Sequence, residues 1–406
     1  MDVDLRAVTE DELAEFVLAD GYGFGFRWGV DDSAAWPRHE MDRTVAAIVD
    51  GDMVATGRNY TLELTLPGDA IVPAGGVSWI STRASHRRRG LLTQVMQYLI
   101  EESHARGEIA SMLTASEGGI YPRFGYGVAT RVQTFEVPRA GAEFRVPYPD
   151  GARARMVEPD VARPVATALW DRIRRTRAGA VSRPDGWWVD EWASAEWIDA
   201  KRRFDVIVDV DGEPAGHAIY AVEGDWNEGY SEKVVAVRDL IAVTPSAELA
   251  LWHYLANIDQ TVAVRAWNRP LDDALPWWLT DARHARVTNV RDFLWVRPID
   301  TAALLAARTY GCDGTLTLQV RDPFLGLEAT EGTFTIDGGP DGARCERSTA
   351  EPDVVLDAAD LGAVVLGGTR PSTLARAGRL HADPAVLGRA DAMFVADRDP
   401  WSATWF

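Results

Sequence analysis

The first residues of the chain carry the apolar spacing of an amphipathic helix. Thr9 stands three positions before Glu12, a capping-box pattern that predicts the start of a helix. Leu13, Phe16 and Val17 follow at helical spacing, so they would form one apolar face. We therefore expect an N-terminal helix that packs through this face onto the rest of its domain.

Past an irregular stretch at residues 21–36, apolar and polar positions alternate as they do in strands. The runs 44–49 and 53–66 flank Asp50-Gly51-Asp52, whose turn chemistry predicts a hairpin. These elements belong to one compact α/β unit, which we expect over residues 1–140. A strand, an amphipathic helix, a second strand and a short helix are expected next in it, at 75–82, 91–104, 109–115 and just before Gly125.

The order of elements then recurs, although no direct sequence repeat is visible. Residues 138–149 are rich in Pro, Gly and Ala and mark a first boundary, and Arg297-Pro298-Ile299-Asp300 marks a second. We therefore expect three domains, at 1–140, 141–297 and 298–406. The elements of the last two are expected as helices at 161–174, 247–258, 301–308 and 357–366, strands at 204–210, 217–222, 234–242, 315–321 and 332–336, and a helix-like C-terminal tail.

The composition fits a soluble globular protein, and the charge narrows its partners. The 406 residues are 47% hydrophobic and 25% charged, a balance that excludes disordered and fibrous proteins. The 61 acidic and 42 basic residues leave a formal charge of −19, the wrong sign for binding nucleic-acid phosphates or an anionic membrane surface. The negative charge is compatible with a cationic substrate. It is equally explained by the solubility that a charged surface gives.

The cysteines, the histidines and the N-terminal residues indicate neither a metal site nor an export signal. Cys312 and Cys345 are the only cysteines, and no Cys/His cluster has metal-ligand spacing, so we expect no disulfide framework and no metal. The N-terminal residues lack the pattern of a signal peptide, and no run of about 18 apolar residues is present to span a bilayer. We therefore expect a cytoplasmic protein.

One stretch combines a strand, a basic turn and the start of a helix. Arg87-Arg88-Arg89-Gly90 follows the strand at 75–82 and opens directly into the helix at 91–104. Such a turn exposes backbone N–H groups at the positive end of the helix dipole, and arginines beside it can bind phosphate oxygens. The pattern indicates a phosphate or pyrophosphate site, although it matches neither a Walker A loop nor Gly-x-Gly-x-x-Gly. A solvated run of arginines is the alternative interpretation.

The residues around this turn resemble a known acetyltransferase signature. The run Arg87-Arg88-Arg89-Gly90-Leu91-Leu92 is similar to the pyrophosphate-binding motif of GCN5-related N-acetyltransferases (GNATs), with Leu92 in place of the last small residue. The run Tyr121-Pro122-Arg123-Phe124-Gly125-Tyr126 resembles the closing pattern of that superfamily. With Ser182-Arg183-Pro184 and the run 361–368, the resemblance covers essentially the full chain and is to the Eis family, named for enhanced intracellular survival.

The resemblance implies an acetyl-CoA-dependent N-acetyltransferase with two tandem GNAT-fold domains and a sterol-carrier-like C-terminal domain. Only the first domain is expected to bind acetyl-CoA, because the corresponding junction of the second, at 239–247, has no Gly-flanked basic turn. The strand would bind the pantetheine arm and the turn the pyrophosphate. The implied binding residues are Ile80, Ser81, Thr82, Arg87, Arg88, Arg89, Gly90, Leu91, Leu92 and Ser116. Ile80 and Leu92 could belong to the core as well.

Two catalytic roles also come from the resemblance. Tyr121 corresponds to the family's general acid toward the CoA sulfur, and the C-terminal carboxylate of Phe406 corresponds to its general base. The aromatic end of the chain, from Trp401 on, is typical of a docked terminus. A packed tyrosine before a Pro turn and an aromatic plug of the third domain are the alternative interpretations. The family is known for hexamers, which implies a homo-oligomer.

The acceptor is the part that the sequence constrains least. Trp36 and Trp79 could wall a pocket for an amine-bearing ring and Asp32 could attract a cation, although chance placement and a solvated acidic loop are alternatives. The resemblance implies cationic small-molecule amines, aminoglycosides foremost, acetylated at one or more positions. Aminoglycoside-acetylating relatives carry acids near the positions of Gly25 and Phe26, where this chain has none. The competing hypothesis is a binding or scaffold protein with a vestigial acetyltransferase unit and an apolar ligand in its third domain.

Overall fold

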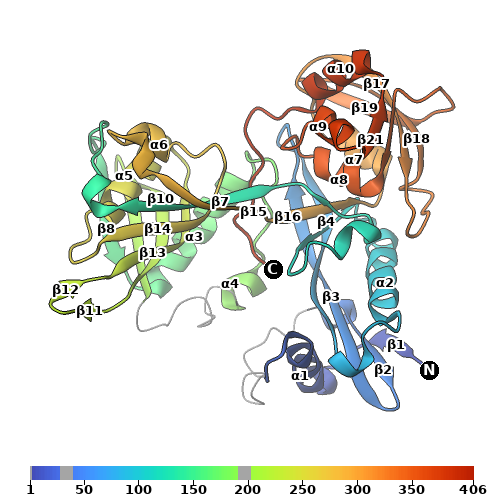
Figure 1. Cartoon of the computed structure of the whole chain (residues 1–406), viewed down its shortest axis with the longest axis horizontal. Coiled ribbons are helices and arrows are strands. Elements are labelled where there is room, and N and C mark those ends of the chain that lie inside the picture. The colour runs from blue at the N-terminus through green and yellow to red at the C-terminus, as the bar shows by residue number, and fades with distance from the viewer. Residues whose placement is uncertain (1, 28–39, 191–202) are drawn as a thin grey trace.

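The computed structural model of the chain describes residues 2–27, 40–190 and 203–406. Within these ranges it contains two seven-stranded sheets, one five-stranded sheet and a two-stranded ribbon, together with helices that pack on the sheets. Figure 1 shows the second sheet on the left, the first at the lower right and the five-stranded sheet above the first. The expected α/β fold, with two similar units and a different third one, is confirmed.

The first sheet has the strand order β1-β2-β3-β4-β5-β16-β6 and contains the expected hairpin between β2 and β3. Its strands and flanking helices are β1 (Asp4–Ala7), β2 (Thr44–Val49), β3 (Asp52–Thr65), β4 (Ile71–Thr82), β5 (Ala110–Thr114), β6 (Gly127–Val128), β16 (Leu294–Pro298), α1 (Leu13–Phe24), α2 (Leu91–Ala105) and the short helix η5 (Tyr121–Phe124). The capping box forms between Thr9 and Glu12. The predicted apolar face of α1 is buried against β3 and β4.

Strand β4 opens a gap in the first sheet. It runs parallel to β5 only over Ala74–Gly76, and beyond that point the two strands have no paired residues. A β-bulge sets Trp79 and Ile80 of β4 opposite the single residue Gly57 of β3, and Trp79 takes a positive φ of 56°. A tryptophan persists in that conformation only where its surroundings over-determine it, and such strain gathers at functional sites. The bulge therefore marks the gap between β4 and β5 as the place to look for chemistry.

The second sheet repeats this construction in the order β15-β7-β14-β13-β10-β9-β8. Its elements are β7 (Arg131–Pro138), β8 (Ala152–Val157), β9 (Arg203–Val210), β10 (Glu213–Glu223), β13 (Val234–Ala242), β14 (Ala263–Arg269), β15 (Arg286–Asp292), α3 (Pro159–Arg174), α4 (Asp185–Asp190), α5 (Pro245–Ala256), α6 (Leu275–Trp278) and the ribbon of β11 (Trp226–Asn227) and β12 (Tyr230–Ser231). Strand β13 runs parallel to β14 only over residues 234–237, and a bulge interrupts its pairing with β10. The junction of β13 with α5 thus corresponds to that of β4 with α2.

The two seven-stranded sheets exchange one strand each. Strand β7 follows β6 along the chain, yet it pairs with β14 and β15 in the second sheet. Strand β16 follows β15, yet it lies between β5 and β6 in the first sheet. The proposed ranges 1–140 and 141–297 therefore each supply one strand to the other's sheet. A single apolar cluster extends across both, from Leu62 of β3 to Trp170 of α3.

The third unit is the five-stranded sheet β19-β18-β17-β20-β21 with its helices. Its elements are α7 (Thr301–Ala307), β17 (Gly314–Arg321), β18 (Gly332–Gly339), β19 (Gly342–Arg347), β20 (Val354–Asp357), α8 (Ala358–Val364), α9 (Pro371–Arg376), β21 (Leu380–Ala382) and α10 (Pro384–Phe394). Helix α8 packs on β16 and β6. A buried ion pair adds a polar link, because Arg297 of β16 donates to Asp322 at 2.7 and 3.1 Å and to the carbonyl of Phe124 at 2.7 Å. The third unit is therefore fixed to η5.

The C-terminal tail, residues 395–406, runs from α10 to the middle of the molecule. Helix α10 fits the expected helix-like end of the chain, but the expectation is wrong for residues 395–406, which form neither a helix nor a strand. Pro400 has no N–H to continue a helix, and the N–H of Trp401 donates to the carbonyl of Ala178 at 2.9 Å instead. Figure 1 marks the C-terminus between the first and second sheets.

Candidate active site

Two cavities lie beside the gap between β4 and β5, and they share a wall. The smaller, the acceptor cavity, has a volume of about 250 Å³ and reaches the end of the chain at Phe406. The larger, the cofactor slot, has a volume of about 430 Å³ and reaches the basic turn before α2. Phe24, Ile80, Ser116 and Tyr121 line both cavities. These four residues therefore stand at the junction of the two spaces.

The end of the cofactor slot has the chemistry of an anion site. Gly90 is the N-cap of α2 and has a φ of 83°, a conformation that favours glycine, and no described side chain caps the first turn. The N–H groups of that turn are open to a phosphate at the positive end of the helix dipole. Arg87 braces the turn, since its Nη2 donates to the carbonyl of Gly23 at 2.7 Å. The residues present fit the pyrophosphate of acetyl-CoA.

Most residues expected to bind acetyl-CoA do line this slot. They are Ile80, Ser81, Thr82, Arg87, Arg88, Gly90, Leu91, Leu92 and Ser116. Arg89 is exposed and lies outside the lining. Trp79 lines the acceptor cavity, where its Nε1 donates to the hydroxyl of Tyr60 at 2.9 Å. Trp36 and Asp32, the other two residues expected on the acceptor side, lie outside the described residues.

Tyr121 is held at the junction by a short helix. It is the first residue of η5, Pro122 follows it, and only 5% of its surface is exposed. The ring of Tyr126 packs edge-on to it with 6.3 Å between ring centroids. Burial raises the pKa of Tyr121 above its ordinary value of 10.0, and a hydrogen bond with Ser116 opposes that rise. The hydroxyl therefore keeps its proton at neutral pH and can donate it.

The tail brings Phe406 into the acceptor cavity. Trp187 of α4 donates from Nε1 to the carbonyl of Trp405 at 2.6 Å, and Thr114 Oγ1 donates to an oxygen of Phe406 at 3.4 Å. Gly76 leaves room for the ring, since a Cβ there would lie 3.1 Å from it. Phe406 is 8% exposed and lines the same cavity as the Tyr121 ring. Phe406 and Tyr121 therefore face one space.

Asp20 is an acidic residue of the acceptor cavity that sequence analysis missed. Its carboxyl is buried, with 6% of the residue exposed, and accepts from Thr56 Oγ1 at 3.4 Å. No ion pair joins it to a cation among the described residues. Burial raises the pKa of Asp20 to about 7, and hydrogen bonds from Thr56 and Ser81 oppose the rise. Helical spacing was a usable signal, because Asp20 stands three residues after Val17 on the apolar face of α1.

Comparison with known proteins identifies the family. Residues 4–129 and 179–298 each match an acetyltransferase (GNAT) domain, and residues 301–403 match a sterol carrier protein domain. An uncharacterized N-acetyltransferase of Streptomyces avermitilis is 38% identical over 100% of this chain and 99% of its own. N-acetyltransferase Eis of Mycobacterium tuberculosis is 32% identical over 98% of both chains. The chain belongs to the Eis family.

Eis-family membership agrees with the fold and defines the enzyme class. The crystal structure of Eis1 from Mycobacterium abscessus has a TM-score of 0.86 with this chain, at 29% identity over 100% of both. The chain is thus an N-acetyltransferase, and GNAT enzymes take the acetyl group from acetyl-CoA. None of the described helices is both long and apolar enough to cross a membrane. In the same ranges, no three His, Cys, Asp or Glu side chains are grouped to hold a metal ion.

Proposed function

We propose that this Eis-family enzyme acetylates primary amines of cationic, aminoglycoside-like small molecules, at one or more positions. The observation that carries the proposal is the meeting of the acceptor cavity and the cofactor slot at Tyr121, with Phe406 at the end of the acceptor cavity. An amine in one cavity would face a thioester in the other.

Acid and base roles follow from the protonation states of these groups. Acetyl-CoA supplies a thioester, which an unprotonated amine can attack. The carboxylate of Phe406 would take the proton from the acceptor ammonium, and the hydroxyl of Tyr121 would protonate the departing thiolate. Burial keeps Tyr121 protonated, which suits an acid, whereas a carboxylate without its proton would suit a base.

Asp20 would recognise the charge of the acceptor. It is a buried carboxyl without a cationic partner among the described residues, and it lines the same cavity as Phe406. An ammonium ion that enters this cavity would lower the pKa of Asp20, so that Asp20 ionises. The positive charge of the acceptor and the negative charge of Asp20 would then compensate each other. The assignment of Asp20 gives the acceptor cavity a second carboxylate where Gly25 and Phe26 offer none.

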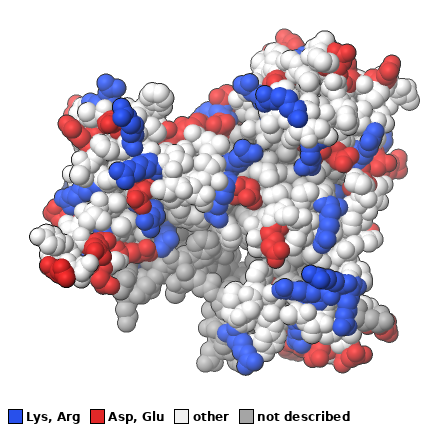
Figure 2. All heavy atoms as spheres, in the orientation of Figure 1, with Lys and Arg blue, Asp and Glu red and all other residues white. Residues whose placement is uncertain are grey.

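The surface charge supports the proposal only weakly. Acidic and basic side chains are interspersed on the face shown in Figure 2, so the formal charge of −19 is not gathered into one patch there. We also propose a hexamer, by family resemblance, and domain limits at residues 140 and 297, from the composition of the chain near them. Sedimentation velocity tests the hexamer, and limited proteolysis followed by mass spectrometry tests the limits.

Release of free thiol from acetyl-CoA, measured with a panel of aminoglycosides and polyamines, tests the proposed reaction. Tyr121→Phe should lower kcat by about 100-fold or more, whereas Tyr230→Phe, at a side chain that is 79% exposed, should not. One glycine added after Phe406 moves the carboxylate and should abolish turnover but not acetyl-CoA binding. Thiol release that no acceptor on the panel increases would contradict the proposal.

Cofactor binding distinguishes a functional acetyltransferase from a scaffold protein with a vestigial acetyltransferase unit. A ligand that binds only the native state raises the melting temperature, so acetyl-CoA should stabilise the protein if the cofactor slot is functional. Gly90→Pro at the N-cap of α2 is incompatible with a φ of 83° and should remove this stabilisation. No change in melting temperature with saturating acetyl-CoA would favour a vestigial unit.

A further inference from the structure

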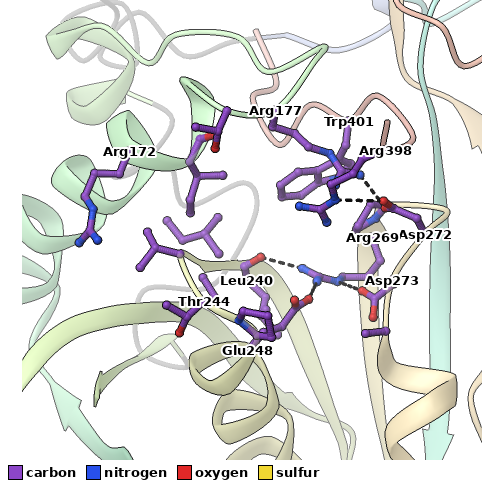
Figure 3. A pocket seen from close by; sticks show the side chains of 18 of the residues that line it. Arg172, Arg177, Leu240, Thr244, Glu248, Arg269, Asp272, Asp273, Arg398 and Trp401 are labelled. Carbon is purple, nitrogen blue, oxygen red and sulfur yellow. Dashed lines mark hydrogen bonds and ion pairs between the residues drawn. The ribbon is translucent and has the colours of Figure 1, made fainter. Parts of the chain in front are cut away.

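The second sheet encloses a cavity at the junction that corresponds to the cofactor slot. Strand β13 ends there and α5 begins, as β4 and α2 do in the first sheet. The volume, about 430 Å³, equals that of the slot. Arg398 and Trp401 of the C-terminal tail close one side (Figure 3), and we therefore call it the tail cavity. Its position makes it a candidate binding site, and this inference does not depend on the identity of the acceptor.

The tail cavity cannot bind acetyl-CoA as the slot does. The guanidinium of Arg269 lies beside β13, on the side where the slot would hold the pantetheine arm. It donates to the carbonyl of Leu240 at 2.7 Å and to Asp273 at 2.7 Å. Glu248, in the first turn of α5, forms an ion pair with the same guanidinium. A carboxylate at that helix start repels a pyrophosphate, and the Leu240 carbonyl is no longer open to a pantetheine amide. The ligand must therefore differ from CoA.

Two other arginines of the tail cavity share one carboxylate as their ion-pair partner. Arg177 and Arg398 both pair with the single carboxylate of Asp272, at 2.6 and 3.3 Å. Arg177 is 4% exposed, and its Nε has no hydrogen-bond partner among the described residues. Arg172 lies across the cavity in Figure 3 and is exposed to solvent. Burial lowers the pKa of Arg177, and the carboxylates of Asp272 and Asp399 oppose that fall.

The remaining walls are apolar and aromatic. Trp401 is 6% exposed, its Nε1 donates to the carbonyl of Asn268 at 3.0 Å, and its ring packs edge-on to Trp170 with 6.0 Å between centroids. Ile241 and Trp278 line other parts of the cavity. A bare inorganic ion would leave this apolar surface uncovered. An anion attached to a ring or an aliphatic body would use both kinds of wall.

We propose that the tail cavity is a second ligand site, which binds a small organic anion through Arg177 and Arg398. The anionic group is a carboxylate or a phosphate, because both accept the paired N–H groups of a guanidinium. Its apolar body packs against Trp401. Since Arg398 and Trp401 belong to the segment that ends at Phe406, a bound anion would also hold the C-terminal tail against the second sheet.

Isothermal titration calorimetry with benzoate and phenyl phosphate tests this proposal. Saturating acetyl-CoA fills the slot beforehand, and no acceptor is added, so the test does not depend on the proposed reaction. Either probe should bind the full chain, and the two arms distinguish a carboxylate site from a phosphate site. Inorganic phosphate should bind at least about tenfold more weakly than phenyl phosphate, because it lacks the apolar body.

Matched variants assign the binding to this cavity. Arg172→Ala combined with Arg398→Ala removes both exposed arginines of the lining and should weaken binding of the probe by about tenfold. Arg175→Ala, on the same helix end but paired with Asp171 and absent from the lining, should bind like the wild type. The double variant keeps Arg177, so its melting temperature without probe shows whether it folds. Unchanged affinity in the double variant, or no binding of either probe at millimolar concentration, would overturn the proposal.

Discussion

Asp322→Asn tests whether the third unit holds the helix that carries Tyr121. Asp322 and Arg297 are both fully buried, and the guanidinium also donates to the carbonyl of Phe124 in η5. Asparagine keeps the size of the side chain and removes only its charge. The variant therefore leaves Arg297 charged and buried, and it loosens one of the polar anchors of η5.

The burial of this pair sets the size of the effect. Removing one partner of a buried ion pair destabilises by about 3–5 kcal/mol, because the other charge stays buried without compensation. Arg297→Met combined with Asp322→Leu removes both charges. The loss should then fall to the roughly 1–3 kcal/mol that an unpaired Phe124 carbonyl costs. The double variant is thus expected to be more stable than the single one.

Urea unfolding followed by near-ultraviolet circular dichroism measures these differences. Asp341→Asn, in the exposed turn between β18 and β19, is the matched control and should change the unfolding free energy by no more than about 0.5 kcal/mol. At a temperature where Asp322→Asn remains folded, its kcat should also be lower, because η5 positions Tyr121. The reasoning is refuted if Asp322→Asn matches the control, or if the double variant is no more stable than the single one.

Other substitutions probe the acceptor cavity and the third unit. A Cβ at Gly76 would lie 2.4 Å from Leu62 and 3.1 Å from the Phe406 ring, so steady-state kinetics of Gly76→Ala should show a lower kcat with acetyl-CoA binding retained in calorimetry. Burial raises the pKa of Asp20 to about 7, so Asp20 favours folding most below its unfolded pKa of 3.8 and loses that stability as pH rises to about 7. Asp20→Asn should therefore match the wild type in urea unfolding near pH 4 and be more stable at pH 8, by up to about 4 kcal/mol; equal stability at pH 8 would contradict the shift. Burial raises the pKa of Cys345 to about 12, so iodoacetamide should label it only after denaturation, as mass spectrometry can check.

Local patterns in the sequence predicted the secondary-structure elements well, but not which elements pair or pack with one another. The turn at Gly51 and the basic turn at Gly90 were found because their chemistry is contained in a few adjacent residues. The exchange of β7 and β16 was not, because apolar alternation marks a strand without stating which sheet receives it. Asp20 differs, because helical spacing places it on the apolar face of α1, although β3 and β4 complete its burial.

The same limit applies to the tail cavity. Arg177 and Arg398 are separated by more than half of the chain, and each alone looks like a solvated charge in the sequence. Only the path of the tail across the second sheet brings both guanidinium groups to Asp272. By contrast, the aromatic character of the chain end was enough to predict docking, because six terminal residues with three aromatic rings avoid water wherever they lie.

The strand exchange has a consequence for synthesis on the ribosome. Strands β5 and β6 are complete once residue 128 has been translated, but the strand that lies between them, β16, ends at Pro298. Until then the nascent chain carries two exposed strand edges with unpaired backbone groups, which are prone to non-native association. The first two units must therefore complete their folding together. A ribosome that stalls in the second would release a first unit with a gap where β16 belongs, a natural substrate for chaperones or proteases.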